Sequence, residues 1–450
     1  MSQSADAALK PLLASVLLEE ELTRKETLGK KGILRTGCNE LDEYVLLGGF
    51  ERGSVVGLSA EEDEVAMLIG LQTIAHALAS ASSSTALRRA MIITTLPASV
   101  LLPKLRMALV SQLYNNPDNG PQQQLQRRVQ EGLERVSIAR IFDIDGLWEV
   151  FGELEHSAAA ASNPPPGVAR GTETARGGCD EASRGKTRVQ AQPKTEIMDS
   201  EDEGSLSPPT SPPHGHLQHS NLAPEDPPVP PLPDIILVTH TSTLLNALFS
   251  GHDRQAAHER VTLVSTHLRY LTRSPALGGP LIMLLNSTTF PTSSHSSDDT
   301  RGGDAPAKDG DRASRRPEPT LRSIFSSSPP REPGHSGFHP QLHPPGHGFY
   351  SARRNKPSFG LVFSQMLDLH LLCTRMPRTR ADAAAVVANQ GTVVPGVSYT
   401  WMVEVVLDEL GVYERIGTDE EEPWGPRRSR EQRWAAVDVE EGRIVDAVLQ

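Results

Sequence analysis

The sequence predicts an α/β fold in which a mostly parallel central sheet is covered by helices on both faces. Along the first two thirds of the chain, short apolar runs of strand length alternate with longer stretches of helical character. This alternation is typical of parallel strands joined by crossover helices, and continuous apolar runs are typical of strands buried on both faces. Near the C-terminus the apolar runs follow one another without helices between them. They predict an antiparallel extension of the same sheet.

The first expected element is an amphipathic helix at residues 5–29, because its apolar residues recur at helical spacing. A buried strand at 54–59 follows a turn at Gly53, and a helix rich in Ala, Leu and Ile follows at 62–80. Further helices are predicted at 145–154 and in the stretch that ends near residue 273. The other expected strands are the apolar runs at 90–96, 135–142, 234–241, 281–288, 367–375, 398–407 and 433–448, the last as a hairpin.

Two segments lack the composition of a folded core. Residues 157–233 and 291–355 hold many of the 36 prolines of the chain, and only 4% of all residues are aromatic. Such segments bury too little apolar surface to offset an ordering entropy of about 1–2 kcal/mol per residue, so both are predicted to be disordered insertions. The predicted organisation is an N-terminal helix and linker, followed by one core in three parts: 1–35, then 36–156, 234–290 and 356–450.

Composition argues against several classes of protein. No run of about 18 apolar residues is present, and no basic segment followed by an apolar block opens the chain, so neither a membrane span nor a secretory signal is expected. Cys38, Cys179 and Cys373 lie far apart, which favours a reducing compartment over a disulfide framework or a zinc site. The net charge of −12 disfavours nonspecific coating of nucleic acid by the whole chain, while a local basic patch stays open.

The residues that follow the linker resemble the RecA/RadA recombinase family. Thr36-Gly37, Leu41-Asp42 and the glycines up to Gly53 have the TG..LD....GG...G order of the family's entry segment. Four later segments then occur in the order of the family: 135–145, 233–251 at the Walker B position, 281–289, and 356–375 after the second DNA-binding loop. The resemblance implies a RecA-like P-loop-type core, similar to the short eukaryotic recombinase paralogues that lack the N-terminal domain.

The nucleotide loop of that family is degenerate here. A P-loop needs G-x-x-x-x-G-K-[ST], because backbone amides, a lysine and a hydroxyl share the triphosphate and Mg²⁺. The matching window begins at Ser59 and places Glu64 at the second glycine, Val65 at the lysine and Ala66 at the hydroxyl. We therefore expect no tight ATP binding.

The other catalytic positions implied by the resemblance are also lost. Thr239 and His240 stand where the Walker B acid is expected, and no acid occurs near Thr95 or Leu96 to serve as a base. The asparagine of the sensor strand is retained as Asn286. The chain is therefore expected not to be an enzyme but a pseudo-ATPase with no cofactor.

Four consecutive acids, Glu61 to Glu64, occupy the place of the phosphates. Like charges at close range repel phosphate, while acids stabilise a helix N-terminus by about 0.3–1 kcal/mol each. Ser59 and Glu62 also have the spacing of a capping box. One interpretation is that carboxylates satisfy the helix end in place of phosphate, and the other is a merely acidic, exposed turn.

The second insertion falls where the family carries its second DNA-binding loop, and its arginines are interleaved with Phe325, Phe338 and Tyr350. Arginines beside stackable aromatics suit single-stranded DNA, although a solvated spacer explains the same composition. The candidate DNA-binding residues are Arg315, Arg316, Arg322, Arg353 and Arg354. Histidines recur every four residues from His335 to His347, but the prolines and glycines between them argue against a metal site.

The function implied by the resemblance is that of a non-catalytic accessory factor in DNA recombination and double-strand-break repair, located in the nucleus. Its expected partners are recombinase or recombinase-paralogue subunits and single-stranded DNA, with no membrane. The leucine stripe of the N-terminal helix packs either on this core or on such a partner. The alternatives are a divergent DNA-dependent ATPase that uses ATP and Mg²⁺, and a scaffold that reuses the fold in another pathway.

Overall fold

The structure is a computed structural model. It describes residues 13–80, 88–114, 122–162, 232–274, 277–289, 321, 323–325, 355–389, 395–411, 413–415, 424–426 and 429–448. These residues fall within Met1–Ser162 and Pro230–Gln450, which form one unit. Within this part of the chain, every helix is too short or too polar to cross a bilayer.

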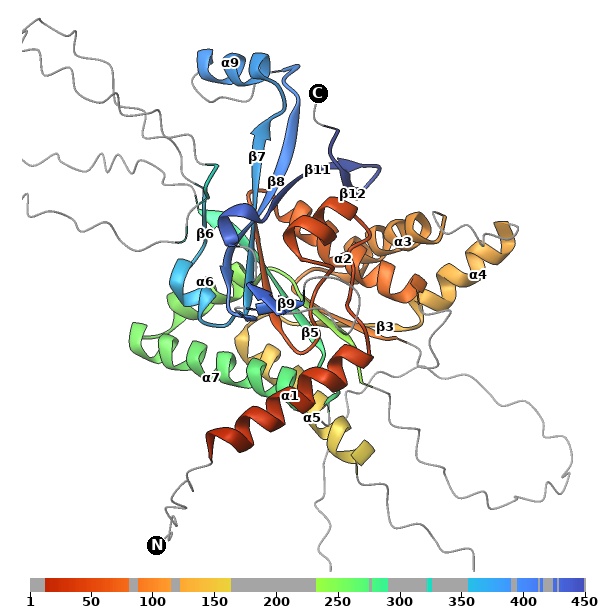
Figure 1. Cartoon of the computed structure of the whole chain (residues 1–450), viewed down its shortest axis with the longest axis vertical. Coiled ribbons are helices and arrows are strands. Elements are labelled where there is room, and N and C mark those ends of the chain that lie inside the picture. The colour runs from red at the N-terminus through yellow and green to blue at the C-terminus, as the bar shows by residue number, and fades with distance from the viewer. Residues whose placement is uncertain are drawn as a thin grey trace, which may run out of the picture. The chain divides into compact units, whose positions relative to one another are not determined.

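Helices and strands alternate from α1 to β5 along the chain (Figure 1). The helices are α1 Ala14–Lys30, the π-helical turn η1 Leu41–Val45, α2 Asp63–Ala79, α3 Ala98–Tyr114, α4 Gln122–Leu133, α5 Ile144–Ser162, α6 Thr241–Gly251, α7 Arg254–Arg273, α8 Gly360–Ser364, α9 Arg380–Ala388 and the 3₁₀ turn η4 Arg430–Gln432. The strands are β1 Val55–Ala60, β2 Ala90–Thr94, β3 Val136–Arg140, β4 Ile235–Val238, β5 Leu281–Thr289, β6 Lys356–Pro357, β7 Leu369–Pro377, β8 Tyr399–Asp408, β9 Tyr413–Arg415, β10 Trp424–Pro426, β11 Trp434–Glu440 and β12 Arg443–Asp446.

The main sheet has the strand order β12-β11-β8-β7-β1-β5-β4-β2-β3, and β6 pairs with β5. The six strands from β7 to β3 are parallel, whereas β8, β11 and β12 pair antiparallel beside β7. The predicted fold class is therefore confirmed: a mostly parallel sheet, helices on both faces and an antiparallel C-terminal extension. The predicted final hairpin is β11–β12.

Side chains alternate between the two faces of the sheet, as the pleat of a strand requires. In β5, Leu281, Met283 and Leu285 belong to one apolar cluster, which also contains residues of α2, α3 and α4. Ile282 and Leu284 belong to a second cluster, which contains residues of α5, α6 and α7. This three-layer arrangement leaves the carboxyl ends of the parallel strands as the edge where a site can form.

The entry segment is held by one carboxylate. Asp42 accepts hydrogen bonds from the backbone amides of Thr36 (2.8 Å) and Gly37 (3.0 Å) and from the Thr36 hydroxyl (2.9 Å). Gly37 has φ +80°, a conformation that favours glycine. These contacts explain why the Thr-Gly and Leu-Asp pairs occur together in the sequence.

The C-terminal half of helix α1 lies against the core. Leu28 reaches Gly53 and Gly279, where an added Cβ would approach its methyl groups to 2.6 and 2.4 Å, and Lys31 donates to the Gly278 carbonyl (2.7 Å). None of the residues of α1 is buried.

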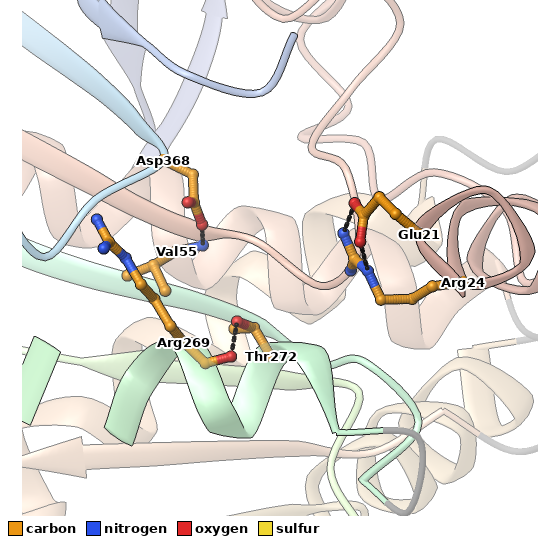
Figure 2. Close-up of polar contacts among 6 residues, drawn as sticks. All are labelled: Glu21, Arg24, Val55, Arg269, Thr272 and Asp368. Atoms are coloured by element: carbon orange, nitrogen blue, oxygen red, sulfur yellow. Dashed lines mark hydrogen bonds and ion pairs between the residues drawn. The ribbon is translucent and has the colours of Figure 1, made fainter. Parts of the chain in front are cut away.

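Figure 2 shows the polar surroundings of this contact. Asp368 accepts a hydrogen bond from the Val55 amide (2.8 Å), which ties the beginnings of β7 and β1 together. Arg24 is bound by Glu21 within α1 itself (2.6 and 2.9 Å). Much of the polar bonding of α1 is therefore internal to the helix.

Besides helices α3 and α4, which were not predicted, three segments differ from the sequence-based expectation. The helix predicted at 145–154 continues to Ser162, so residues 157–162 of the first predicted insertion are helical. The stretch that ends near 273 is two helices, because Asp253 caps α7 by accepting from the Gln255 amide (3.1 Å). Residues 323–325, inside the second predicted insertion, hold a defined position on the sheet.

Candidate functional site

The position of a nucleotide loop lies where β1 passes into α2. Strand β1 ends at Ala60 and α2 begins at Asp63, so only Glu61 and Glu62 connect them. A phosphate loop needs several residues whose backbone amides curve around the phosphates before the helix starts. The connection here is too short to form such a cradle.

The acids in this turn are held by cations from other elements. Glu62 binds Arg375 of β7 (2.9 Å), and Glu64 pairs with Lys104 of α3. The Arg375 guanidinium also lies over the ring of Tyr399, 3.9 Å from its centroid. Phosphate would have to displace these ion pairs as well as overcome the negative charge.

The predicted capping box is wrong. Glu62 is the N-cap of α2 and makes no side-chain cap hydrogen bond. Ser59 belongs to β1, and its hydroxyl bonds within the sheet interior. Glu62 and Glu64 pair with Arg375 and Lys104, whereas Asp63 and Glu64 lie in the first turn of α2, where acids stabilise a helix N-terminus.

Burial raises the pKa of the Glu61 carboxyl to about 7. A raised carboxyl pKa stabilises the fold at low pH, and this contribution is lost as the pH rises from about 4.5 through 7. We expect Glu61→Gln to remove about 1 kcal/mol of this pH dependence, after allowance for partial exposure. Urea unfolding at pH 5 and pH 8 measures it, with Glu43→Gln on exposed η1 surface as the control. An unchanged difference between the two pH values would contradict the assignment.

The positions of the lost lysine and hydroxyl are part of the core. Val65 is 2% exposed and Ala66 is 1% exposed, both on the inner side of α2. The cavity nearest to them has a volume of only about 10 Å³, room for at most one water. Its lining residues are Asp63, Ala66, Met67, Thr239, His240, Leu285 and Asn286. The residues present therefore do not fit a bound nucleotide.

A buried chain of hydrogen bonds fills the region beside this turn. Asn286 Nδ2 donates to Ser59 Oγ (3.0 Å), and Ser59 Oγ lies 2.8 Å from His370 Nε2. On the other side of the imidazole, Nδ1 lies 3.4 Å from Ser364 Oγ, which donates to the Gly360 carbonyl (3.0 Å). Ser59, Asn286 and His370 all lie on the face covered by the cluster of α5, α6 and α7.

The direction of this chain assigns the tautomer of His370. The Ser364 hydroxyl proton is used on Gly360, so Ser364 accepts from Nδ1–H of the imidazole. Nε2 is then the acceptor for the Ser59 hydroxyl, which itself accepts from Asn286. Complete burial lowers the pKa of His370 to about 3, so the ring is neutral. The retained sensor asparagine thus joins β5 to β1 within the protein instead of facing a phosphate.

The Walker B position is occupied by a pair of threonines. The Thr239 hydroxyl donates to Thr94 Oγ1 (2.7 Å), which bridges the ends of β4 and β2. His240 has φ +56° and lies 2.9 Å from Thr239 Oγ1 through Nδ1, and burial lowers its pKa. Neither residue supplies the acid that was expected at the Walker B position.

The candidate DNA-binding residues Arg315, Arg316, Arg322, Arg353 and Arg354 lie outside the described residues, as do Phe338 and Tyr350. Phe325 is described and packs edge-on against Trp434, with ring centroids 5.2 Å apart. Over the described ranges, no group of three His, Cys, Asp or Glu side chains is arranged to hold a metal ion.

Sequence reasoning missed His370, Ser364 and the cations Lys104 and Arg375. One signal was available, because His370 is a polar residue inside the apolar run LDLHLLC. A buried polar side chain in a strand implies a specific hydrogen-bond partner. That partner, Ser59, lies 311 residues earlier in the chain, so it can be identified only from the fold.

Comparison with known proteins gives little further information. No protein-family model matches the chain, and no curated protein matches it. Among solved structures it is similar to one described as the crystal structure of the RadB recombinase, with a TM-score of 0.39 and 9% sequence identity. The match covers 92% of this chain and all of that chain. A likeness this distant carries no argument about activity, so function has to be inferred from the residues themselves.

Proposed function

We propose that this protein is a RecA-like, recombinase-paralogue-like accessory factor that works without hydrolysing ATP. Its role is in DNA recombination and double-strand-break repair, in the nucleus, through contacts with recombinase or paralogue subunits and with single-stranded DNA. The biology of this proposal comes from the order of family-like segments in the sequence. The expectation that ATP is not hydrolysed is supported by the residues at the nucleotide position.

The observation that carries the proposal is the two-residue connection between β1 and α2. It removes the phosphate cradle, and Val65 and Ala66 place apolar core where the lysine and the hydroxyl would act. The threonine pair at the Walker B position and the use of Asn286 inside the sheet agree with this interpretation. These features together support a protein that does not use ATP.

Titration of the full chain with fluorescent ATP and Mg²⁺ tests the nucleotide half of the proposal. We expect no saturable binding up to about 1 mM, a range that covers ordinary enzyme affinities. Glu64→Gln, which removes one acid but leaves Val65 in the core, is also expected not to bind ATP. A RecA-type protein with an intact P-loop is the positive control. Micromolar binding that depends on Mg²⁺ would overturn the proposal in favour of a divergent ATPase.

A role through protein contacts is supported by the surface of α1. Five large apolar side chains in and just before this helix are between 39% and 71% exposed: Leu13, Val16, Leu17, Leu18 and Leu22. A cluster of exposed leucines on one helix is typical of a surface that binds another protein. Of the two predicted alternatives for the leucine stripe, these exposures favour a partner for the N-terminal half of the helix.

Affinity purification of the tagged full chain after DNA damage tests the biological half. We expect recombinase or paralogue subunits among the recovered proteins. Their absence, with recovery of proteins from an unrelated pathway, would instead identify a scaffold that reuses the fold.

A further inference from the structure

Glu404 is a buried carboxylate on the antiparallel extension of the sheet, apart from the nucleotide position. It lies in β8, is 1% exposed, and pairs in register with Trp434 of the neighbouring strand β11. Residues directly opposite each other on antiparallel strands project from the same face. Apolar neighbours Val403 and Val405 point to the other face, into the cluster of α2 and α3.

The acceptor needs of Glu404 are met by a short segment that is remote in sequence. The Ser323 hydroxyl donates to Oε1 of Glu404, and the Ile324 amide donates to Oε2 (2.9 Å). The ring of Phe325 packs edge-on against Trp434 at a centroid distance of 5.2 Å. We call residues 323–325 the clasp segment.

Further contacts close the clasp segment on itself and on the sheet. The Phe325 amide donates to Ser323 Oγ (3.1 Å), and the Ser323 amide donates to the Asn355 carbonyl (3.4 Å). Asn355 is in turn bonded to Thr374 of β7 through its side chain (2.8 Å). The clasp segment therefore fixes one point of the long connection between β5 and β6 onto the sheet.

The clasp segment explains how the carboxylate of Glu404 can be buried. Burying a carboxylate without donors is costly, so such a residue persists in a strand when something supplies the hydrogen bonds. Within the described ranges, both hydrogen bonds recorded for the Glu404 carboxylate come from Ser323 and Ile324, and Arg430 adds a longer-range attraction. Glu404 and Trp434 thus form a built receptor for residues 323–325.

We propose that Ser323 is a phosphorylation site, and that a phosphoryl group there releases the clasp segment from Glu404 and Trp434. A serine/threonine kinase would transfer the γ-phosphoryl group of ATP to Ser323 Oγ, with ADP as the leaving group and the hydroxyl proton passing to solvent. The substrate is the open form of the segment, because Ser323 is only 7% exposed when the clasp is closed. This proposal is independent of the proposed role in recombination.

The physical reason for release is the exchange of a donor for an anion. In the closed clasp, the Ser323 hydroxyl donates a hydrogen bond to Glu404. Phosphorylation removes that donor and adds a charge of about −1.5 to −2 beside a buried carboxylate. Repulsion at this distance and the cost of desolvating the phosphate both oppose closure.

Hydrogen exchange of the full chain, with phosphoserine encoded at position 323, tests the proposal. We expect the amides of residues 323–325 to exchange at least about tenfold faster than in the unmodified chain. Glu404→Gln, which keeps the shape but weakens both hydrogen bonds, should accelerate the same amides to a smaller extent. Phosphoserine at exposed Ser99 and Glu440→Gln on exposed β11 are the matched controls, and neither should change this exchange.

Two results would overturn the proposal. The first is unchanged protection of residues 323–325 in the phosphoserine protein while the amides of β8 show an intact sheet. The second is a chain purified from its source cells in which mass spectrometry finds Ser323 unmodified both with and without DNA damage. A phosphate on Ser323 together with lost protection supports it.

Discussion

Lowering the pH from 7 to 5 is expected to cost the folded chain about 2 kcal/mol of stability through His370 alone. The imidazole has a pKa of about 3 in the fold, well below its ordinary value of 6.5. In the unfolded chain His370 therefore binds a proton below about pH 6.5, whereas in the folded chain it stays neutral. The free energy of unfolding falls as the pH drops below that value. At pH 5 the unfolded value has been passed by about 1.5 pH units, each worth about 1.4 kcal/mol.

Urea unfolding of the wild type and of His370→Gln at pH 7 and pH 5 measures this effect. The glutamine retains hydrogen-bonding capacity toward Ser59 but does not titrate. Between pH 7 and pH 5 the variant should therefore lose about 2 kcal/mol less of its free energy of unfolding than the wild type. Glu61 acts in the opposite direction over the same range, because its raised pKa stabilises the fold as the pH falls. The comparison is therefore made in a Glu61→Gln background. Equal losses with and without His370 would contradict a buried neutral imidazole.

The double substitution Leu18→Glu with Leu22→Glu is expected to reduce recovery of the protein partner about 100-fold or more. These side chains are 60% and 58% exposed on α1. Burying a leucine in an interface contributes about 2 kcal/mol, and two charges in an apolar contact add a further penalty. Quantitative affinity purification of the full chain, followed by mass spectrometry, measures the change.

Stability separates this expectation from an effect on the core. Because no residue of α1 is buried, the double variant should unfold within about 0.5 kcal/mol of the wild type. Lys25→Glu, on the same helix and also exposed, is the matched control and should retain the partner. A double variant that recovers the partner normally, or that is destabilised by several kcal/mol, would show that the leucines do not form the contact.

The strands of the main sheet other than β6 were predictable because their signal is local, whereas the short strands β6, β9 and β10 were not predicted. Central strands such as β1 and β4 are runs of apolar residues that are fully buried on both faces. Helices α3 and α4 were missed for opposite reasons. Helix α3 contains Pro103, which interrupts the helical pattern, and α4 is largely polar, with Val129 buried at 5% exposure.

The candidate site was predictable only as a set of missing groups. The sequence placed Glu64, Val65 and Ala66 at the nucleotide positions, and the structure puts those residues in the first turn of α2. What replaces the nucleotide site could not be predicted, because the partners of Ser59 and Glu62 are His370 and Arg375, more than 300 residues away. Long-range pairing depends on the order of strands in the sheet, and a single sequence does not encode that order in any local pattern.

The short connection after β1 limits how a phosphate loop could be built into this fold. Introducing one would require unwinding the start of α2, breaking the ion pairs of Glu62 and Glu64, and placing a lysine at the position of Val65, which is 2% exposed. Each of these steps alone lowers stability. A single substitution therefore cannot install nucleotide binding here, because the packing of the core has to change with it.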